Sequence, residues 1–307
     1  MTTSPQTAFL ERRQDNLEVF NAASNGAIIL DNELIEGDFR KRTFYKVGGS
    51  IESRNVNSTD PVTGKKIGAG ESVSVKAPWK YGPYETTEEA FKRRGRDVSE
   101  FSEVIGVDVA DATLEGYIKY ALQGLVAAIG ANADMTVSAD IATDGKKTLT
   151  RGLRKYGDKF NRVALFVMHS TTYFDIVDQA IDNKIYEEAG VVVYGGQPGT
   201  LGKPVLVTDT MPVDAILGLV AGAVSRNGIT GSGLPFLRYQ RPGKPCPLAI
   251  AQRARLTLNC WVTAGMRRRG ANPDLTKIGT GANWKKHFTS NKSTAGVLIK
   301  LEAPAGE

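Results

Sequence analysis

The sequence is poor in the residues that build metal centres and disulfide frameworks. Among its 307 residues it has two cysteines, Cys246 and Cys260, and two histidines, His169 and His287. A structural zinc site needs about four such ligands, and disulfide-rich domains need several cysteine pairs, so neither class fits. We interpret both cysteines as small buried apolar residues, because free cysteine is among the most buried residue types; a single bridge stays open.

Long apolar runs are also absent. No window approaches the roughly 18 consecutive apolar residues of a membrane-spanning helix, and residues 1–6 do not begin a secretory signal. We therefore expect no membrane association and a protein made in a cytoplasm. The composition, 41% hydrophobic and 23% charged, is that of a globular chain. Its length suggests about two domains.

Signatures of catalysis are missing as well. The pair His169-Ser170 suggests a nucleophile, but no Gly-x-Ser-x-Gly turn surrounds the serine, and we interpret Ser170 as a helix N-cap. Asp209 could form a carboxylate pair with Asp175 or Asp178, although a solvated loop acid is commoner. The glycine-rich segments lack the residue order of a phosphate-binding loop. We predict no catalytic, cofactor-binding or metal site.

The net charge of +6 is distributed unevenly along the chain. From residue 240 onward, twelve lysines and arginines face three acids, whereas in the first forty residues three arginines face seven carboxylates. Such asymmetry suggests an electrostatic partner, either nucleic acid or an acidic surface of another subunit.

A basic patch near the C-terminus is the best candidate for nucleic-acid contact. Aromatic side chains alternate with cations there, so bases could stack while phosphates are neutralised. The alternative is a polar face with an anchoring tryptophan between subunits, because aromatics and arginine both favour interfaces. The patch comprises Arg267, Arg268, Arg269, Lys285 and Lys286, with Trp284, His287 and Phe288 beside the lysines.

Residues 38–84 show strand periodicity and no helical period. In residues 72–77 polar side chains alternate with Val73, Val75 and an alanine, as in a strand with one apolar face. We expect its partner at 43–56, with turn residues forming the tip of a long hairpin. An isolated hairpin is marginal in water, so a neighbouring subunit is a natural support, although packing on its own body stays open.

The remaining segments alternate between helix and strand. Residues 1–37 fit an extended arm, a capping box at Thr86 begins a short helix, and Asp111 is expected to cap a long apolar helix that ends near Gly130. A compact α/β unit over 151–240 contains a buried strand, a helix from Ser170 and further strands. The predicted strands are 163–168, 191–194, 204–208, 215–224 (with helix as the alternative), 256–262 and 297–301.

This order of segments resembles the Hong Kong 97-type fold of tailed-bacteriophage major capsid proteins. Two stretches carry most of the resemblance: Leu165-Phe166-Val167-Met168-His169-Ser170, leading into a helix, and the later Gly202-Lys203-Pro204-Val205-Leu206-Val207-Thr208-Asp209-Thr210-Met211-Pro212. In that family an apolar strand with such a cap, and a Gly-x-Pro-Val-x-Val-x-Asp-x-Met-Pro strand, occur in the axial domain.

The resemblance implies an α+β fold with an N-terminal arm at 1–37 and an extended loop at 38–84. A peripheral domain with a spine helix would comprise 85–150 plus 241–307, and an axial domain 151–240. The extended loop would contact a neighbouring subunit through Lys65, Lys66, Val73 and Val75. In some members a lysine of this loop is cross-linked; we expect no cross-link here.

The implied function is self-assembly into hexamers and pentamers of an icosahedral virion shell around double-stranded DNA. Because only some 37 residues precede the hairpin, a separate scaffolding protein is implied, together with a portal, and decoration proteins stay open; assembly would take place in the host cytoplasm. An encapsulin-like nanocompartment shell would share these features. A small-molecule α/β enzyme using 151–240, with the hairpin as a lid, and a sequence-independent DNA-binding protein are alternatives from other classes.

Overall fold

The structure is a computed structural model. It describes residues 5–30, 39–46, 55–59, 66–84, 98–145, 147–182, 186–188, 191–193, 202–227, 248–258, 261–262, 273–286 and 290–302, and the single positions 51, 53, 64 and 93. The α-helices are α1 (Pro5–Ala23), α3 (Val98–Gly130), α4 (Ile141–Asp144), α5 (Lys147–Arg154), α6 (Ser170–Asp182) and α7 (Leu275–Ile278). Short 3-10 helices are η1 (Ala133–Met135), η2 (Gly157–Arg162), η4 (Gly281–Asn283) and η5 (Asn291–Ser293).

The strands form two larger sheets and two small ones. The first five-stranded sheet has the order β1 (Ile28–Leu30), β10 (Val224–Asn227), β11 (Leu248–Leu258), β3 (Gly68–Tyr84), β2 (Phe39–Lys46). The second has the order β4 (Thr136–Ala139), β14 (Gly296–Leu301), β9 (Ala215–Val220), β5 (Val163–Met168), β8 (Val205–Val207). The two-stranded sheets pair β6 (Tyr186–Glu188) with β7 (Val191–Val193), and β12 (Trp261–Val262) with β13 (Lys285–Lys286).

The second sheet is the centre of the core because helices cover both of its faces. On β14 the side chain of Leu298 lies against Gly130 at the end of α3, whereas that of Ile299 lies against Gly152 of α5. Successive strand residues point to opposite faces, so α3 and α5 lie on opposite sides of β14. All six residues of β9 are buried. This double coverage explains why β5 and β9 are continuous apolar runs without alternation.

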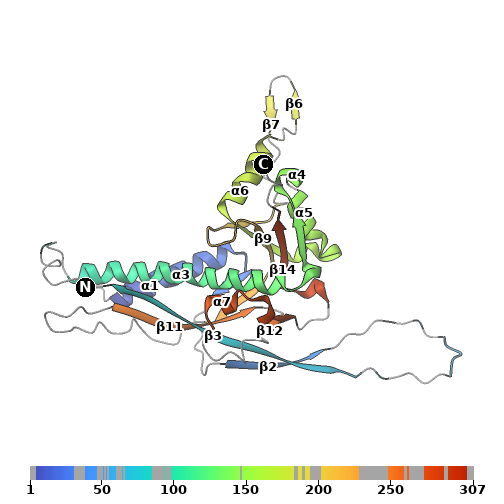
Figure 1. Ribbon diagram of the computed structural model, residues 1–307, viewed down its shortest axis with the longest axis horizontal. Helices are drawn as coiled ribbons and strands as arrows, with labels where there is room; N and C mark the ends of the chain where they lie inside the picture. The colour runs from blue at the N-terminus through green and yellow to red at the C-terminus, as the bar shows by residue number, and fades with distance from the viewer. Residues whose placement is uncertain are drawn as a thin grey trace.

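The long helix α3 connects the two sheets. It has 33 residues, and Leu122, Leu125 and Ile129 in its second half are buried in the main core. Its first half lies beside α1 and contacts β11. Figure 1 shows α3 running across the molecule, with the second sheet above it and the β2–β3 hairpin extending away on the other side.

The partners of β3 change along its length. β3 pairs with β11 from Val75 to Tyr84, and with β2 from Gly68 to Val75. Val75 is therefore the point at which the sheet narrows to two strands. We call residues 39–46 and 66–75, with the described positions between them, the distal hairpin. Its eight paired residues per strand span about 26 Å.

Several sequence-based expectations are corrected by these elements. The N-terminal segment contains a 19-residue helix, α1, and the strand β1, so it is not an extended arm. The partner of β3 is 39–46 and not 43–56; the glycine pair that follows at 48–49 suits the end of a strand. The proximal half of β3 packs on its own chain through β11, which the sequence did not predict.

The start of the long helix was also predicted wrongly. α3 begins at Val98, so Asp111 lies in its interior and caps nothing. Its carboxylate instead accepts hydrogen bonds from Arg12 and Asn16 of α1. The strands predicted at 163–168, 191–194, 204–208, 215–224 and 297–301 are confirmed as β5, β7, β8, β9 and β14, with β9 ending at Val220, whereas the capping box at Thr86 lies outside the described residues. The division into peripheral and axial domains stays a prediction.

None of the helices in the described part of the chain combines the length and hydropathy that crossing a bilayer requires.

Candidate assembly interface

The distal hairpin carries the most exposed large apolar side chains of the described residues. Tyr45 is 80% exposed, Ile67 68%, Val56 92% and Ile51 fully exposed. All four belong to the distal hairpin, which has no third strand among the described residues and, in Figure 1, projects away from the rest of the molecule. Clustered exposed apolar residues mark an interaction surface, because a soluble monomer rarely leaves them in water.

The residues predicted for this contact can be placed only in part. Lys66 is exposed and lies just before β3, whereas Lys65 lies outside the described residues. Val73 and Val75 are in β3, opposite Lys41 and Phe39 of β2. Sequence analysis missed Tyr45, Ile51 and Ile67. Their signal was a set of bulky apolar residues among glycines and charges, at positions where no core was expected.

The base of the hairpin is fastened to the long helix. The Tyr81 hydroxyl at the base of β3 donates a hydrogen bond to the Asp108 carboxylate of α3, and Tyr81 packs against the buried Val109 and Ala110. This attachment fixes the direction in which the distal hairpin leaves the body.

One helical turn further along α3, Asp111 fastens α1. Its carboxylate accepts hydrogen bonds from the Arg12 guanidinium at 3.0 Å and from the Asn16 amide at 2.7 Å. The hydrogen bond from Arg12, followed by that from Asn16, holds the pKa of Asp111 below its ordinary value. Because the pair is exposed to solvent, we assign it a positioning role and little stability.

The basic patch is divided by the structure. Lys285 is exposed, but Lys286 is half-buried and its ammonium donates a hydrogen bond to the Asn291 side chain. Trp284 is buried, and its indole N–H donates to the Ile278 carbonyl at 2.8 Å. The hypothesis that bases stack on Trp284 is therefore wrong, because its ring is buried in the core. Arg267, Arg268, Arg269, His287 and Phe288 lie outside the described residues.

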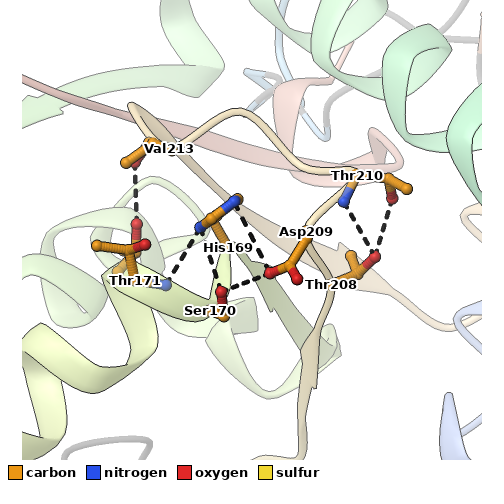
Figure 2. Close-up of polar contacts among 8 residues, drawn as sticks. His169, Ser170, Thr171, Thr208, Asp209, Thr210 and Val213 are labelled. Carbon is orange, nitrogen blue, oxygen red and sulfur yellow. Dashed lines mark hydrogen bonds and ion pairs between the residues drawn. The ribbon is translucent and has the colours of Figure 1, made fainter.

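The side chains of His169, Ser170 and Asp209 are held together at the start of α6 by a hydrogen bond and an ion pair (Figure 2). Nδ1 of His169 accepts a hydrogen bond from the backbone N–H of Thr171 at 3.1 Å, so the histidine caps α6 and the prediction for Ser170 is wrong. The Ser170 hydroxyl donates to the Asp209 carboxylate. The lone pair of Nδ1 is thus occupied, and it lies 3.5 Å from the serine oxygen, too far to act as its base.

The same cluster joins the start of α6 to the loop after β8. Asp209 also lies 3.8 Å from Nε2 of His169, and the Thr172 hydroxyl donates to the Val213 carbonyl at 2.9 Å. Asp209 thus contacts serine and histidine; the proposed pairing with Asp175 or Asp178 is not among its interactions in the described residues. No group of three or more His, Cys, Asp or Glu side chains within these residues could hold a metal ion.

Comparison with known proteins identifies the family. The family model for Gp13-like proteins, described as major capsid protein 13-like, matches residues 2–298. The chain belongs to this major capsid protein family. None of the curated proteins matches the sequence.

Solved structures agree on the fold. A chain from Mycobacterium phage Adephagia has a TM-score of 0.55 at 10% identity, covering 92% of this chain and 91% of the other. A chain from Mycobacterium phage Cain also has a TM-score of 0.55 at 10% identity, with coverages of 93% and 91%. The capsid of Ralstonia phage GP4 has a TM-score of 0.50 at 11% identity, covering 92% and 90%.

The chain is therefore a structural shell protein with an α+β, Hong Kong 97-type fold, and its place is the virion capsid. The nanocompartment and the small-molecule enzyme are not favoured, because the matched family consists of major capsid proteins. In such a protein the functional site is the set of surfaces that copies present to one another.

Proposed function

We propose that this capsid protein builds a closed icosahedral shell of hexamers and pentamers around phage double-stranded DNA, and that the distal hairpin is its principal contact with a neighbouring copy. One observation supports the hairpin assignment: four large apolar side chains, one in β2 and three between β2 and β3, are exposed on the distal hairpin. Covering them removes apolar surface from water at about 25 cal/mol per Å².

The hairpin is suited to this role because its two halves differ. The proximal half has β11 beside it and is fixed to α3 through Tyr81 and Asp108, so it holds a defined direction. In the part of the chain that the structure describes, the distal half has a strand edge without a pairing partner and exposed apolar side chains, and a neighbouring copy could pair with the edge and cover the side chains together. Lys66, Val73 and Val75 lie in the same segment and belong to the proposed contact, as does Lys65 by its place in the sequence.

We infer that the protein acts by binding and not by catalysis. Membership of a structural family supports this, as does the His169–Ser170 geometry, in which the histidine lone pair serves as a cap. We also retain the division into an N-terminal segment at 1–37, an extended loop at 38–84, a peripheral domain (85–150 and 241–307) and an axial domain at 151–240.

The proposed partners are further copies of the chain, a separate scaffolding protein, a portal, and packaged DNA held without sequence specificity during assembly in the host cytoplasm; decoration proteins stay open. For DNA, exposed Lys285 is the described member of the basic patch that is available. Arg267, Arg268 and Arg269 are proposed to complete it from their place in the sequence. Lys286 contributes less, because its ammonium already bonds Asn291.

The double variant Tyr45→Ser/Ile67→Ser tests the hairpin proposal. Both side chains are exposed, so the subunit should fold with unchanged circular dichroism and thermal midpoint, while sedimentation and negative-stain imaging should show loss of closed particles. This design is cleaner than deleting residues 57–70, because that deletion removes Gly68, Ala69 and Gly70 from the paired part of β3.

A matched control removes exposed apolar surface elsewhere. Val104 of α3 and Val213, in the loop before β9, are 57% and 53% exposed. The variant Val104→Ser/Val213→Ser should assemble far better than the hairpin variant. Normal shells from the hairpin variant would refute the proposed contact, and equal failure of both variants would show that the effect is not specific to the hairpin.

A further inference from the structure

The helix α5 presents a stripe of positive charge to solvent. Lys147, Arg151 and Arg154 are exposed and spaced four and three residues apart, which places them on one face of the helix. The opposite face is buried through Leu149 and Leu153. A Cβ added at Gly152 would lie 2.8 Å from the Ile299 side chain, so the α5 backbone packs directly on β14. The core therefore holds the charged stripe in a fixed orientation.

Only the middle charge of this stripe has an ionic partner within the described residues. The Arg151 guanidinium bonds the Asp144 carboxylate at 2.5 Å. Lys147 and Arg154, at the two ends, form no ion pair in the part of the chain that the structure describes. Residues 140–162 contain seven lysines and arginines against three aspartates, so the surroundings do not neutralise them.

The helix α1 presents a stripe of the opposite sign with the same spacing. Glu11, Asp15 and Glu18 are exposed and four and three residues apart. Phe20 is buried, and Arg12 and Asn16 are engaged by Asp111 of α3, so neighbouring faces of α1 are occupied. Glu11 and Glu18 form no ion pair within the described residues.

The two stripes match in length. Glu11 and Glu18 are seven residues apart, as are Lys147 and Arg154, and each separation corresponds to about 10.5 Å along a helix axis. Within one chain the helices belong to different surroundings: α1 packs on α3 and β1, whereas α5 packs on β14 and β4 (Figure 1).

We propose that the acidic face of α1 in one copy lies against the basic face of α5 in a neighbouring copy. This rests on the proposed assembly into a shell and assigns it a second, electrostatic contact beside the hairpin. The contact is heterologous, because different surfaces meet, and such contacts generate closed rings when their rotation closes. A second copy is the proposed occupant because α1 of the same chain carries three exposed acids with the same spacing, four and three residues, as the cations of α5.

Charge reversal tests the contact. The basic-face variant is Lys147→Glu/Arg154→Glu and the acidic-face variant is Glu11→Lys/Glu18→Lys; Arg151 is kept because of its bond to Asp144, and Asp15 because it lies near Arg12. Each variant should fold and give about tenfold fewer particles than the wild type, since like charges then face each other. Added salt should recover part of the yield, because it screens the repulsion.

Combining the reversals gives the decisive outcome. A chain with all four substitutions should assemble again, and a mixture of the two single-face variants should assemble better than either alone, because the restored pairs then lie between copies. The control Lys119→Glu/Lys300→Glu changes the net charge as the basic-face variant does, at two exposed lysines outside both stripes, and should assemble normally.

Three results would overturn the contact: single-face variants that assemble like the wild type, a four-substitution chain that folds and does not recover, or a basic-face variant that forms normal shells with less packaged DNA. The last result would mean that the basic face of α5 binds the packaged DNA and not a neighbouring copy. If the wild type forms no particles under any condition, the proposed assembly function fails first, and that is seen before any variant is made.

Discussion

The second sheet, which forms the centre of the core, and the distal hairpin are built from similar residue types. The sheet buries its apolar side chains, whereas the hairpin exposes them. In β14, β9 and β5 apolar side chains are covered on both faces, and Phe166, Leu217 and Val297 are fully buried. In the distal hairpin Tyr45, at 80% exposure, and Ile67, at 68%, face water. The apolar side chains of the sheet are buried within one chain, whereas those of the distal hairpin are exposed, and we propose that a neighbouring copy covers them.

We infer from this difference that the second sheet serves folding of the subunit and the distal hairpin serves assembly. Burial in the sheet supplies the stability of the subunit, because each covered apolar side chain contributes roughly 1.5–3 kcal/mol. On our proposal, the distal hairpin contributes little to that stability, and a neighbouring copy covers its apolar surface. Changes in the sheet should therefore lower the free energy of unfolding, and changes in the hairpin should lower assembly alone.

The largest effect is expected in the sheet. Replacing Phe166 of β5 by alanine leaves a cavity between covered faces and should lower the free energy of unfolding by about 3–5 kcal/mol. Denaturant titration of the dissociated subunit measures this. A loss below about 1 kcal/mol would mean that the sheet can collapse around the cavity and is not the rigid centre described here.

A glycine-to-alanine substitution, made once in the second sheet and once in the distal hairpin, distinguishes the two regions. A Cβ at Gly296 would lie 2.5 Å from the carbonyl oxygen of Gly218, which is backbone and cannot move aside, whereas a Cβ at Gly70 would meet the tip of the Phe44 ring at 2.6 Å. Gly296→Ala should therefore destabilise the subunit by about 1–3 kcal/mol. Gly70→Ala should cost less than about 1 kcal/mol, because the ring can turn away.

These two variants are compared by thermal unfolding of the free subunits. Equal losses would contradict the view that the distal hairpin is loosely coupled to the core.

A smaller effect on folding is expected from surface changes in the hairpin. Tyr45→Ser and Ile67→Ser should each alter the free energy of unfolding by about 0.5 kcal/mol or less, because an exposed side chain loses little when it is shortened. Denaturant midpoints measured beside Phe166→Ala check this. A loss as large as that of the core variant would show that the hairpin is folded onto its own subunit.

The smallest effect concerns the attachment of α1 to α3. Bonding by Arg12 lowers the pKa of Asp111, so this attachment contributes fully above the unfolded pKa of about 3.9 and is lost as the pH falls through the lower folded value. Hydrogen-exchange protection factors of α1 should therefore fall below about pH 4. In Asp111→Asn they should already be low at pH 7 and change little with pH, and wild-type protection in that variant would refute the attachment.

Much of the sheet was predictable because its signal is local. A run such as Val163–Met168 has the length and composition of a strand covered on both faces, and the alternation near residues 297–301 marked β14. The first half of α3 was missed because Asp111 is a preferred N-cap residue. Its actual partner, Arg12, lies 99 residues away in the sequence, which no local pattern reveals.

The candidate interface was predictable only in outline. Alternation at 72–77 indicated a strand, but exposure depends on which strand lies beside it. That β11 accompanies β3 only as far as Val75 follows from the tertiary fold. The same limit applies to Trp284, whose neighbours in the sequence suggest a nucleic-acid surface, whereas its indole bonds Ile278 in the core.

Hydroxyl-radical footprinting of Tyr45 and Ile67, in dissociated subunits and in assembled shells, tests most directly whether the hairpin is completed by a neighbour. Both side chains should be oxidised readily in the subunit and strongly protected in the shell, with buried Phe166 unreactive in both. Equal oxidation of Tyr45 and Ile67 in the two states would contradict the account.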